Sequence, residues 1–365
     1  MEYTTKNYNV NKIGDNFSDY VLGIDIGGTN TNLAIAGICN KKPNLLFSHN
    51  YKTKKLESII PAIEDVLNYI NKNFKIEVNF ACIGAAGIVS SSNDFVQLTN
   101  AKWSVSSKKI INKTSLNFVY IINDFQAIGY GLNLLDPENK DDIYTIRHGK
   151  NNFYKSKSTR AIIGAGTGLG KSILTYEENF NAYIPIPSEG GHSDLPIEND
   201  FETQLVEFIK KLRGISQPLS YEEVLSGRGI ESIYLYLRNI EKTKETKYTK
   251  EIDESSDKTP LISKYRNLDE ICKETFRLFT RFYARCAKNF VLDTLSRGGL
   301  YIAGGIAAKN KDIFSTEDFL NEFENAFNRI DLLKEIPINV ITNYDVSLYG
   351  ACYAAMYKLL SKKSQ

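Results

Sequence analysis

Residues 161–172 combine an apolar segment with a glycine-rich loop of a kind that can hold phosphate. Four glycines occupy the seven positions 164–170, directly after the apolar residues 161–163. Glycine allows positive φ and lets several backbone N–H groups converge on an anion without a Cβ in the way. Glycine clusters also make ordinary tight turns, so this loop alone leaves both interpretations open.

The same loop nearly matches a P-loop, because residues 170–172 spell Gly-Lys-Ser, the end of the Gly-x-x-x-x-Gly-Lys-Ser/Thr motif. The first position of that motif is Ala165 instead of glycine. A P-loop must also open a helix, whereas residues 172–176 are mostly β-branched or aromatic and two prolines follow soon after. The sequence therefore predicts a strand, a glycine loop and a second strand that begins near Lys171.

An earlier stretch, residues 21–36, has the same pattern of apolar strand, Gly/Thr turn and second strand. Each turn is expected to bind phosphate through backbone N–H groups. Two such hairpins, one around Thr29 and one around Thr167, indicate two similar half-domains that face each other across one nucleotide.

Asn123 and Asp124 follow an apolar strand expected at 117–122. Ligands of open α/β sheets bind at the carboxyl ends of such strands. A carboxylate there can accept the proton of a substrate hydroxyl that attacks a γ-phosphoryl group. Asp124 could also simply cap the helix expected from about Gln126. With two phosphate hairpins in the chain, catalysis is the interpretation we favour.

Three further motifs could bind a substrate. Glu189 and His192, brought onto one loop by two glycines, can bind the vicinal hydroxyls of a sugar. A zinc site would need three protein ligands, and no second His or Cys is near them. The acidic pair 222–223 precedes a glycine turn, and the turn at 303–306 could support a flat adenine or ribose. Both turns also have a plain structural interpretation.

The elements that position these residues follow from the hydrophobic periodicity. Residues 1–19 are expected to be a loose leader, and the charged, apolar-poor run 241–260 a solvated surface excursion. Strands are predicted at 20–26, 31–38, 45–52, 78–84, 117–122, 142–146, 160–164, 299–303 and 337–342, and helices at 57–74, 200–213, 228–240, 268–294, 317–329 and 346–361.

Composition narrows the class of protein. The 365 residues, 42% hydrophobic and 24% charged, can bury a sizeable core and are expected to form two domains. The 45 basic and 43 acidic residues are well mixed, which favours neither nucleic acid nor membrane as a partner. The five widely spaced cysteines are typical of reduced thiols, and no signal peptide is evident, so we expect a cytoplasmic protein. His49 and His148 lack a chemical context and are expected to be surface or incidental residues.

Together these motifs resemble those of the bacterial-type glucokinases, a branch of the wider sugar kinase, actin and heat-shock-chaperone ATPase fold. The resemblance spans nearly the whole chain from residue 20. One such motif would be weak evidence, but several in family order are specific. They are residues 23–30, residues 98–100 with Trp103, and residues 123–125, 164–170, 189–192, 225–229 and 302–306.

The resemblance implies an α/β, two-domain actin-like ATPase with ribonuclease H-like duplicated domains and with nucleotide and sugar in the interdomain cleft. The small domain would comprise 20–133 plus 346–362, and the large domain 134–345. The implied activity is ATP-dependent phosphorylation of D-glucose at the 6-hydroxyl. The implied partners are glucose and ATP, with no nucleic acid and no membrane; whether the protein forms a homodimer is left open.

The resemblance also assigns roles residue by residue. Asp124 would be the catalytic base, and Asp25 would organise Mg²⁺ through water. The ligands of the sugar would be Asn100, Asn123, Asp124, Glu189, His192 and Glu222. The nucleotide would be held by Asp25, Gly27, Gly28, Thr29, Asn30, Gly166, Thr167, Gly168, Gly170, Gly304 and Gly305.

Departures from the family pattern leave alternatives open. Many relatives have a basic side chain where this chain has Asn32, which puts one phosphate contact in doubt. The repressor, open-reading-frame and kinase (ROK) family usually has a Cys-rich zinc loop after its Glu-x-Gly-His-like motif, and none is present here. A kinase for mannose, glucosamine or an N-acetylhexosamine remains an alternative, as does a non-catalytic sugar sensor. A sensor would be expected to have lost its base, whereas Asp124 is present.

Overall fold

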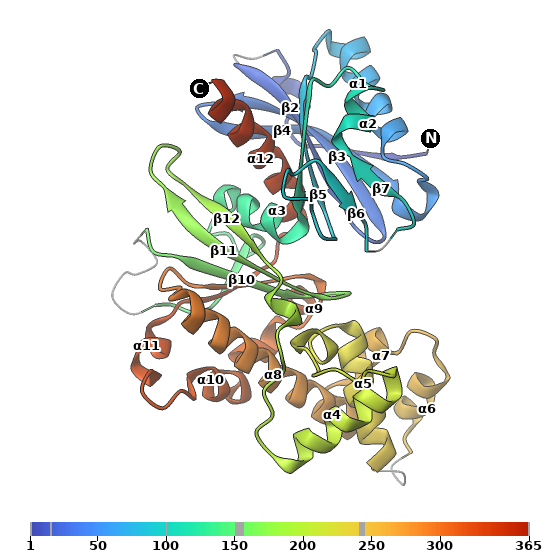
Figure 1. The fold of residues 1–365 in the computed structure, drawn as a ribbon, viewed down its shortest axis with the longest axis vertical. Helices are drawn as coiled ribbons and strands as arrows, with labels where there is room; N and C mark the ends of the chain where they lie inside the picture. The colour runs from blue at the N-terminus through green and yellow to red at the C-terminus, as the bar shows by residue number, and fades with distance from the viewer. Residues whose placement is uncertain (1, 15–16, 100, 150–156, 241–244, 364–365) are drawn as a thin grey trace. The chain divides into compact units, whose positions relative to one another are not determined.

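A computed structural model of the chain describes residues 2–14, 17–99, 101–149, 157–240 and 245–363 (Figure 1). It divides into two compact units. The first comprises Met1–Asp136, Tyr176–Pro187 and Asn343–Gln365, and the second Pro137–Thr175 and Ser188–Thr342. The large domain expected from the sequence spans 134–345, whereas residues 176–187 group with the first unit.

The first sheet has the strand order β1-β4-β3-β2-β5-β8. β2, β3 and β4 pair antiparallel, while β2, β5 and β8 run parallel. Successive residues of β2 enter different core clusters, Val21 one and Leu22 the other, because side chains alternate between the faces of a sheet. The strands are β1 (Thr4–Asn7), β2 (Asp19–Ile26), β3 (Asn30–Cys39), β4 (Lys42–Lys52), β5 (Phe80–Ala85) and β8 (Phe118–Asn123).

Helices cover both faces of this sheet (Figure 1). The apolar stripe of α1, which includes Ile63, Val66 and Ile70, packs with one core cluster, and α12 packs with α3 and β2 on the other face. The predicted helices at 57–74 and 346–361 are confirmed within a few residues. The remaining elements of this part are η1 (Val10–Lys12), η2 (Thr53–Lys55), α1 (Ile60–Phe74), β6 (Phe95–Gln97), β7 (Ser104–Ser106), α2 (Ser107–Ile111), α3 (Asp124–Gly131), η3 (Leu132–Leu134) and α12 (Val346–Lys363).

The prediction of a loose leader is wrong for its described residues. β1 adds an edge strand to β4, with Thr4 opposite Asn50 and Asn7 opposite Phe47. The Ser18 N–H donates to the Ile38 carbonyl at 2.9 Å, so the C-terminal end of this segment is also hydrogen-bonded to the sheet. A polar edge strand gains its stability from backbone pairing, which composition does not reveal.

His49 is buried, so the surface position that was one expectation for it is wrong. It lies on β4 with no exposed surface, and the ring of Tyr3 stacks on it at 4.0 Å. No hydrogen-bond partner of its ring nitrogens is found within the described chain. Burial lowers the pKa of His49, opposed in part by the charge of Asp65.

The second sheet has the order β12-β11-β10-β13-β14-β9. β10 pairs antiparallel with β11 and parallel with β13, which is parallel to β14. β9 closes the far edge antiparallel to β14. The strands are β9 (Ile143–Arg147), β10 (Arg160–Ala165), β11 (Leu169–Glu177), β12 (Ala182–Ser188), β13 (Leu300–Ala303) and β14 (Ile338–Ile341).

The long helix α8 is the centre of the helical part of the second unit (Figure 1). It contacts α5, α7, α10 and β10, and buried Phe279 and Tyr283 contribute to that core. The predicted helix 317–329 is too long, because α10 ends at Glu324 and a separate helix starts at Ile330. The helices are η5 (Gly190–His192), α4 (Asp200–Arg213), η6 (Tyr221–Glu223), α5 (Gly227–Ile240), α6 (Lys247–Glu254), α7 (Lys258–Tyr265), α8 (Glu270–Thr294), α9 (Gly305–Lys309), η7 (Lys311–Ser315), α10 (Glu317–Glu324) and α11 (Ile330–Glu335).

The described part of the run 241–260 is folded rather than a solvated excursion. α6 and the start of α7 fall in it, and Thr249 and Ile252 of α6 are fully buried. Thr246 caps α6 and donates its hydroxyl to Asp269 at 2.7 Å. Two buried residues on one helical face are enough to dock a short helix, although the composition of the run is polar.

Among the described residues, no helix combines the length and the hydropathy that a membrane span requires.

Candidate active site

The first glycine turn, residues 27–29, joins β2 to β3 as the sequence predicts. The Gly27 N–H donates to the Asn30 carbonyl at 2.9 Å, which closes the turn. Thr53 braces it: its N–H donates to the Thr29 carbonyl at 3.0 Å and its Oγ1 to the Gly27 carbonyl at 2.7 Å. The N–H groups of Gly28 and Thr29 have no partner among the residues that the structure describes. The turn therefore offers these two donors to an anion.

Asp25 lies on β2 shortly before this turn. Its Oδ1 accepts from Ser347 Oγ of α12 at 2.7 Å, and Asn32, its cross-strand neighbour on β3, also bonds to the carboxylate. Burial raises the pKa of Asp25, and both hydrogen bonds oppose that rise. A cation nearby would favour the charged form. Mg²⁺ usually keeps several waters and binds one or two carboxylates plus substrate phosphates, so one half-buried carboxylate beside a phosphate turn fits it.

β8 brings Asn123 and Asp124 to the same edge of the first sheet. Ile26, Ala85 and Asn123 lie in one row across the parallel strands β2, β5 and β8. The first glycine turn directly follows Ile26, and Asp124 directly follows Asn123. The structure therefore places the carboxylate and the turn at the carboxyl ends of strands in one sheet.

The cap of α3 is mainly Asn123, not Asp124. Asn123 Oδ1 accepts the Phe125 N–H at 2.8 Å, and Gln126 Oε1 accepts the Asn123 N–H at 3.2 Å. Asp124 Oδ1 lies 3.0 Å from the same Phe125 N–H, as the first helical residue. Because the capping oxygen of Asn123 is engaged, its amide nitrogen is the group it could offer to a hydroxyl.

The motif at 98–100 begins against the end of β5. The Thr99 N–H donates to the Ala86 carbonyl at 3.1 Å, and buried Leu98 belongs to the core. Asn100 itself lies outside the described residues.

The second glycine turn, residues 166–168, joins β10 to β11 in a hairpin with Ala165 opposite Leu169. The chain continues as a strand, so the structure rules out the helix that a P-loop needs. The Gly166 N–H donates to the Gly168 carbonyl at 2.8 Å, and the Leu169 N–H donates to Glu222 Oε2 at 2.9 Å. Within the described chain, the N–H groups of Thr167 and Gly168 lack a partner and face no intramolecular competition for an anion.

A cavity of about 500 Å³ adjoins this second turn within the second unit. Gly166, Thr167 and Gly305 line it. Gly304 has a φ of +93°, and a Cβ there would lie 2.7 Å from the Ala165 carbonyl oxygen, so only glycine suits the position. The cavity also has lining residues that the sequence analysis did not name, among them Arg228, Thr259, Pro260, Phe276 and Lys309.

The cavity wall is connected to the turn by hydrogen bonds. The Gly227 N–H at the start of α5 donates to the Gly166 carbonyl at 2.9 Å, and Thr259 Oγ1 of α7 donates to the Gly227 carbonyl at 2.7 Å. These bonds hold the starts of α5 and α7 against the hairpin. The cavity combines free backbone donors, polar side chains and an aromatic ring, the features that a nucleotide pocket needs.

The loop of Glu189 and His192 packs directly on this hairpin. A Cβ at Gly191 would lie only 1.9 Å from the Leu169 carbonyl oxygen, so the close approach requires glycine. His192 Nε2 lies 3.9 Å from Glu189 Oε2, and both side chains are about two-thirds exposed, at 60% and 65%. The two side chains therefore form an exposed pair that can receive a polar ligand.

Glu222 also contacts the hairpin, through a hydrogen bond to its backbone. Its Oε2 accepts from the Leu169 N–H, and its Oε1 lies 3.3 Å from Arg228 Nη2. Its side chain is only 15% exposed. The backbone of Leu169 thus contacts both predicted sugar motifs: its carbonyl lies against Gly191, and its N–H donates to Glu222.

Lys171 lies on β11 as predicted, and it is buried. Its Nζ lies 5.3 Å from the ring centre of Tyr221 and 5.0 Å from that of Phe290. Burial raises the pKa of the neighbouring Cys286 thiol to about 11, and the ammonium of Lys171 reduces the rise. The aromatic rings stabilise the ammonium.

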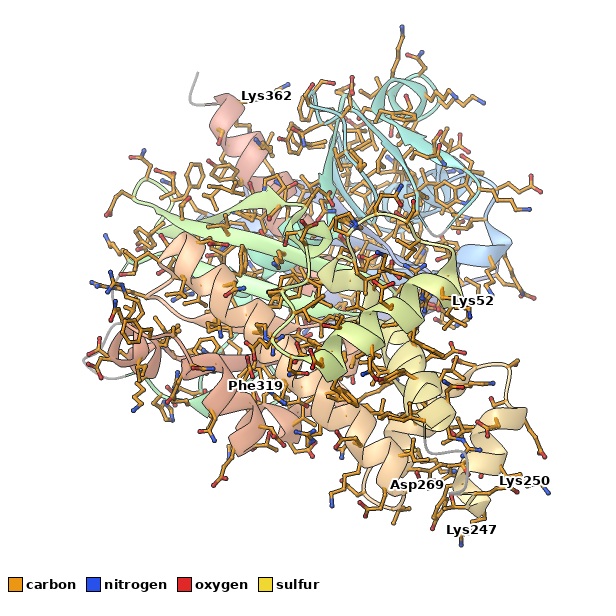
Figure 2. The ribbon with its side chains drawn as sticks, turned by 60° about the horizontal axis from the view of Figure 1, so that its bottom comes forward. Lys52, Lys247, Lys250, Asp269, Phe319 and Lys362 are labelled. Atoms are coloured by element: carbon orange, nitrogen blue, oxygen red, sulfur yellow. The ribbon has the colours of Figure 1, made fainter. Side chains whose placement is uncertain are left out.

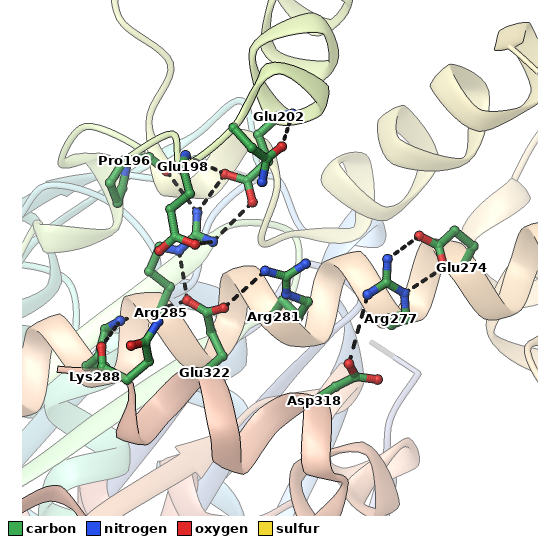
Figure 3. A network of polar contacts seen from close by, with 12 residues as sticks. Pro196, Glu198, Glu202, Glu274, Arg277, Arg281, Arg285, Lys288, Asp318 and Glu322 are labelled. Atoms are coloured by element: carbon green, nitrogen blue, oxygen red, sulfur yellow. Dashed lines mark hydrogen bonds and ion pairs between the residues drawn. The ribbon is translucent and has the colours of Figure 1, made fainter. Parts of the chain in front are cut away.

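The segment after His192 is anchored by the charged network in Figure 3. Arg285 of α8, 2% exposed, donates to the Pro196 carbonyl at 3.1 Å and pairs with Glu202 at 2.8 Å and Glu322 at 3.1 Å. Removing one partner of such a buried network typically costs about 3–5 kcal/mol. The network therefore holds the segment that follows the loop of Glu189 and His192.

Several residues at the site were missed by the sequence analysis. Arg228 lies within the motif 225–229, where a basic residue in a glycine turn was an available signal. Thr259 lies in the polar run, and Ser347 and Thr53 are remote in sequence from the groups they contact. No local sequence pattern marks Thr259, Ser347 or Thr53, because their roles depend on which strands and helices are neighbours.

Comparison with known proteins decides the family. The family model described as Glucokinase matches residues 22–358. The glucokinase of Trichormus variabilis is similar to this chain, with 33% identity over 349 residues that cover 92% of this chain and 98% of the relative. The chain belongs to the glucokinase family. The resemblance stated from the motifs is thereby confirmed.

Solved structures of sugar kinases have the same fold. The structure of glucokinase from Balamuthia mandrillaris in complex with glucose has a TM-score of 0.75 at 24% identity, covering 92% of this chain and 93% of that one. That of a ROK family glucokinase from Streptomyces griseus in complex with glucose and AMPPNP has a TM-score of 0.60 at 19% identity, covering 93% and 99%. The predicted two-domain actin-like ATPase fold is confirmed.

Proposed function

We propose that this protein transfers the γ-phosphoryl group of ATP to the 6-hydroxyl of D-glucose. The observation that carries the proposal is the alignment of Ile26 on β2 with Asn123 on β8 at one edge of the first sheet. The first glycine turn directly follows Ile26, and Asp124 directly follows Asn123. Membership of the glucokinase family supports the same activity. The related structures that contain glucose or AMPPNP support the choice of sugar and nucleotide.

In the proposed reaction, Asp124 accepts the proton of the 6-hydroxyl as the hydroxyl oxygen attacks the γ-phosphorus. The remaining sugar hydroxyls are proposed to bind Asn100, Asn123, Glu189, His192 and Glu222. Carboxylates accept from hydroxyls, while the Asn123 amide can donate. Glu222 can serve the sugar only while also holding the Leu169 N–H.

The backbone N–H groups of the two glycine turns are proposed to bind the phosphates. In the first turn the donors are Gly28 and Thr29, and in the second they are Thr167 and Gly168. The cavity beside the second turn is proposed to take the nucleoside, with Gly305 in its lining and Gly304 directly before it in the chain. Mg²⁺, near Asp25, would neutralise phosphate charge.

The activity is tested by measuring ADP release over a panel of hexoses with Mg-ATP. We expect glucose to give the highest kcat/KM among glucose, mannose, glucosamine and N-acetylglucosamine. Preference for another hexose would correct the substrate, and the absence of turnover with every sugar would favour a sensor.

Asp124→Asn tests the base. The substitution keeps the volume and leaves the Asn123 cap in place, so we expect kcat to fall about 10²–10⁴-fold while glucose still binds. Steady-state kinetics and glucose titration calorimetry measure the two quantities. A variant that kept more than about a tenth of the wild-type kcat would contradict the assignment.

A further inference from the structure

Lys52 stands beside the first glycine turn, although it is remote from that turn in sequence. It is the last residue of β4 and lies directly opposite Asn30, the residue that follows the turn. Its Nζ donates to Asn30 Oδ1 at 2.8 Å, and its side chain is exposed. Figure 2 labels Lys52 on the ribbon with its side chain drawn.

The backbone next to Lys52 is part of the turn's own construction. The following residue, Thr53, bonds to both the Thr29 and Gly27 carbonyls. Its Oγ1 also lies 2.9 Å from that of buried Thr31. These bonds fix the position of the Lys52 backbone relative to the turn.

The strand register places Lys52 on the sheet face of Asp25. Asp25 is opposite Asn32 on β3, and Asn32 is opposite Asn50 on β4, whose Nδ2 donates to Asn32 Oδ1 at 2.6 Å. Lys52 shares a face with Asn50, two residues away. Ser347 of α12 bonds to Asp25, so this is the face that α3 and α12 cover, and α3 begins at Asp124.

The charge of Lys52 is not neutralised by the protein. Within the described chain, no carboxylate lies at ion-pair distance from its Nζ, and its hydrogen-bond partner is a neutral amide. By contrast, nearby Lys55 pairs with Glu2 at 2.8 Å. An exposed ammonium beside unpaired backbone donors adds a full positive charge to an anion site.

We propose that the ammonium group of Lys52 binds the terminal phosphates of the nucleotide. This inference rests on the proposed function. The long, flexible stem lets the ammonium exchange Asn30 Oδ1 for a phosphate oxygen without moving the strand. The role would be specific to anions, because the Lys52 side chain is exposed and ends in a charged ammonium.

Lys52→Met tests the proposal, with Lys54→Met as the matched control. Lys54 is also exposed, is two residues away, and lies in η2 rather than on the strand. We expect Lys52→Met to lower kcat/KM for ATP and the affinity for ATP by about tenfold to a hundredfold, the effect of one charge-assisted hydrogen bond. Adenosine affinity, glucose affinity and thermal stability should stay at the values of Lys54→Met.

The salt dependence separates a charge contact from a merely structural role. With the charge removed, the decline of ATP affinity with rising salt should be shallower, and Lys52→Arg should restore both affinity and slope. An ATP affinity of Lys52→Met within about twofold of the control would overturn the proposal. Titration with ATP tests the role of Lys52 even if the protein phosphorylates no sugar. Wild-type turnover tests the proposed function, so the two proposals can fail separately.

Discussion

Gly191→Ala tests whether the sugar loop must rest on the phosphate hairpin. The new Cβ would lie 1.9 Å from the Leu169 carbonyl oxygen, whereas ordinary contacts begin near 3.4 Å. The two segments must therefore separate by roughly 1.5 Å, since 3.4 less 1.9 is 1.5. The hairpin is held by the β10–β11 register, whereas the Glu189 and His192 side chains that flank buried Gly191 are exposed, so we expect the loop to move.

A displacement of about 1 Å in a positioning group can cost about a hundredfold in rate. We therefore expect Gly191→Ala to lower kcat/KM for glucose about a hundredfold, or about 2.7 kcal/mol, while ATP affinity changes little. Initial rates over varied glucose at saturating ATP measure the effect, and calorimetric unfolding checks that the protein is folded.

Gly190→Ala is the matched control for this experiment. Its Cβ would meet Lys171 Cδ and Ser188 Oγ, each at 3.1 Å, and shifts of a few tenths of an ångström in these two side chains relieve both contacts. We expect it to cost less than about fivefold. Equal effects of the two substitutions, or a Gly191→Ala enzyme with normal glucose kinetics, would refute the packing argument.

Two further predictions concern Lys171 and His49. Lys171→Met should leave KM for ATP within about twofold, since its Nζ contacts rings instead of the turn. Thr167→Val keeps the backbone N–H but removes a hydroxyl from the turn, so it should raise KM for ATP about tenfold; the reverse result in ATP kinetics would contradict the hairpin assignment. The pKa of His49 is lowered in the folded state, so below about pH 6.5 the unfolded state takes up the proton first. The free energy of unfolding therefore decreases as the pH is lowered. His49→Phe should remove up to about 1.4 kcal/mol per pH unit of that dependence, and urea unfolding at pH 5.5 and 7.5 showing an unchanged slope would disprove it.

Much of the secondary structure could be predicted from local patterns. The glycine turns at 27–29 and 166–168 lie between apolar strands of period two, and this arrangement identified both hairpins. The stripe of α1 and the apolar periodicity of α8 were equally clear. Each of these signals is contained in a short window of sequence.

The errors arose where stability comes from distant partners. β1 is polar and is held by pairing with β4, and Ile252 docks a polar helix through one face. His49 was expected to be a surface or incidental residue, but Tyr3 and α1 cover it because strand register determines which side of β4 it occupies. Composition reports how much a segment can bury, not which neighbour it meets.

For the candidate site, the sequence by itself determined the residue types and their order: two phosphate turns, Asp124 after a strand, and an acidic loop with His192. Only the tertiary structure decided which groups lie together, such as Lys52 beside Asn30, Ser347 on Asp25, Glu222 on the Leu169 N–H, and Arg228 in the cavity wall. The physical reason is that a turn or cap depends on φ, ψ and hydrogen bonds within a few residues. Contacts across strands and helices depend instead on register and packing, which the whole chain sets cooperatively.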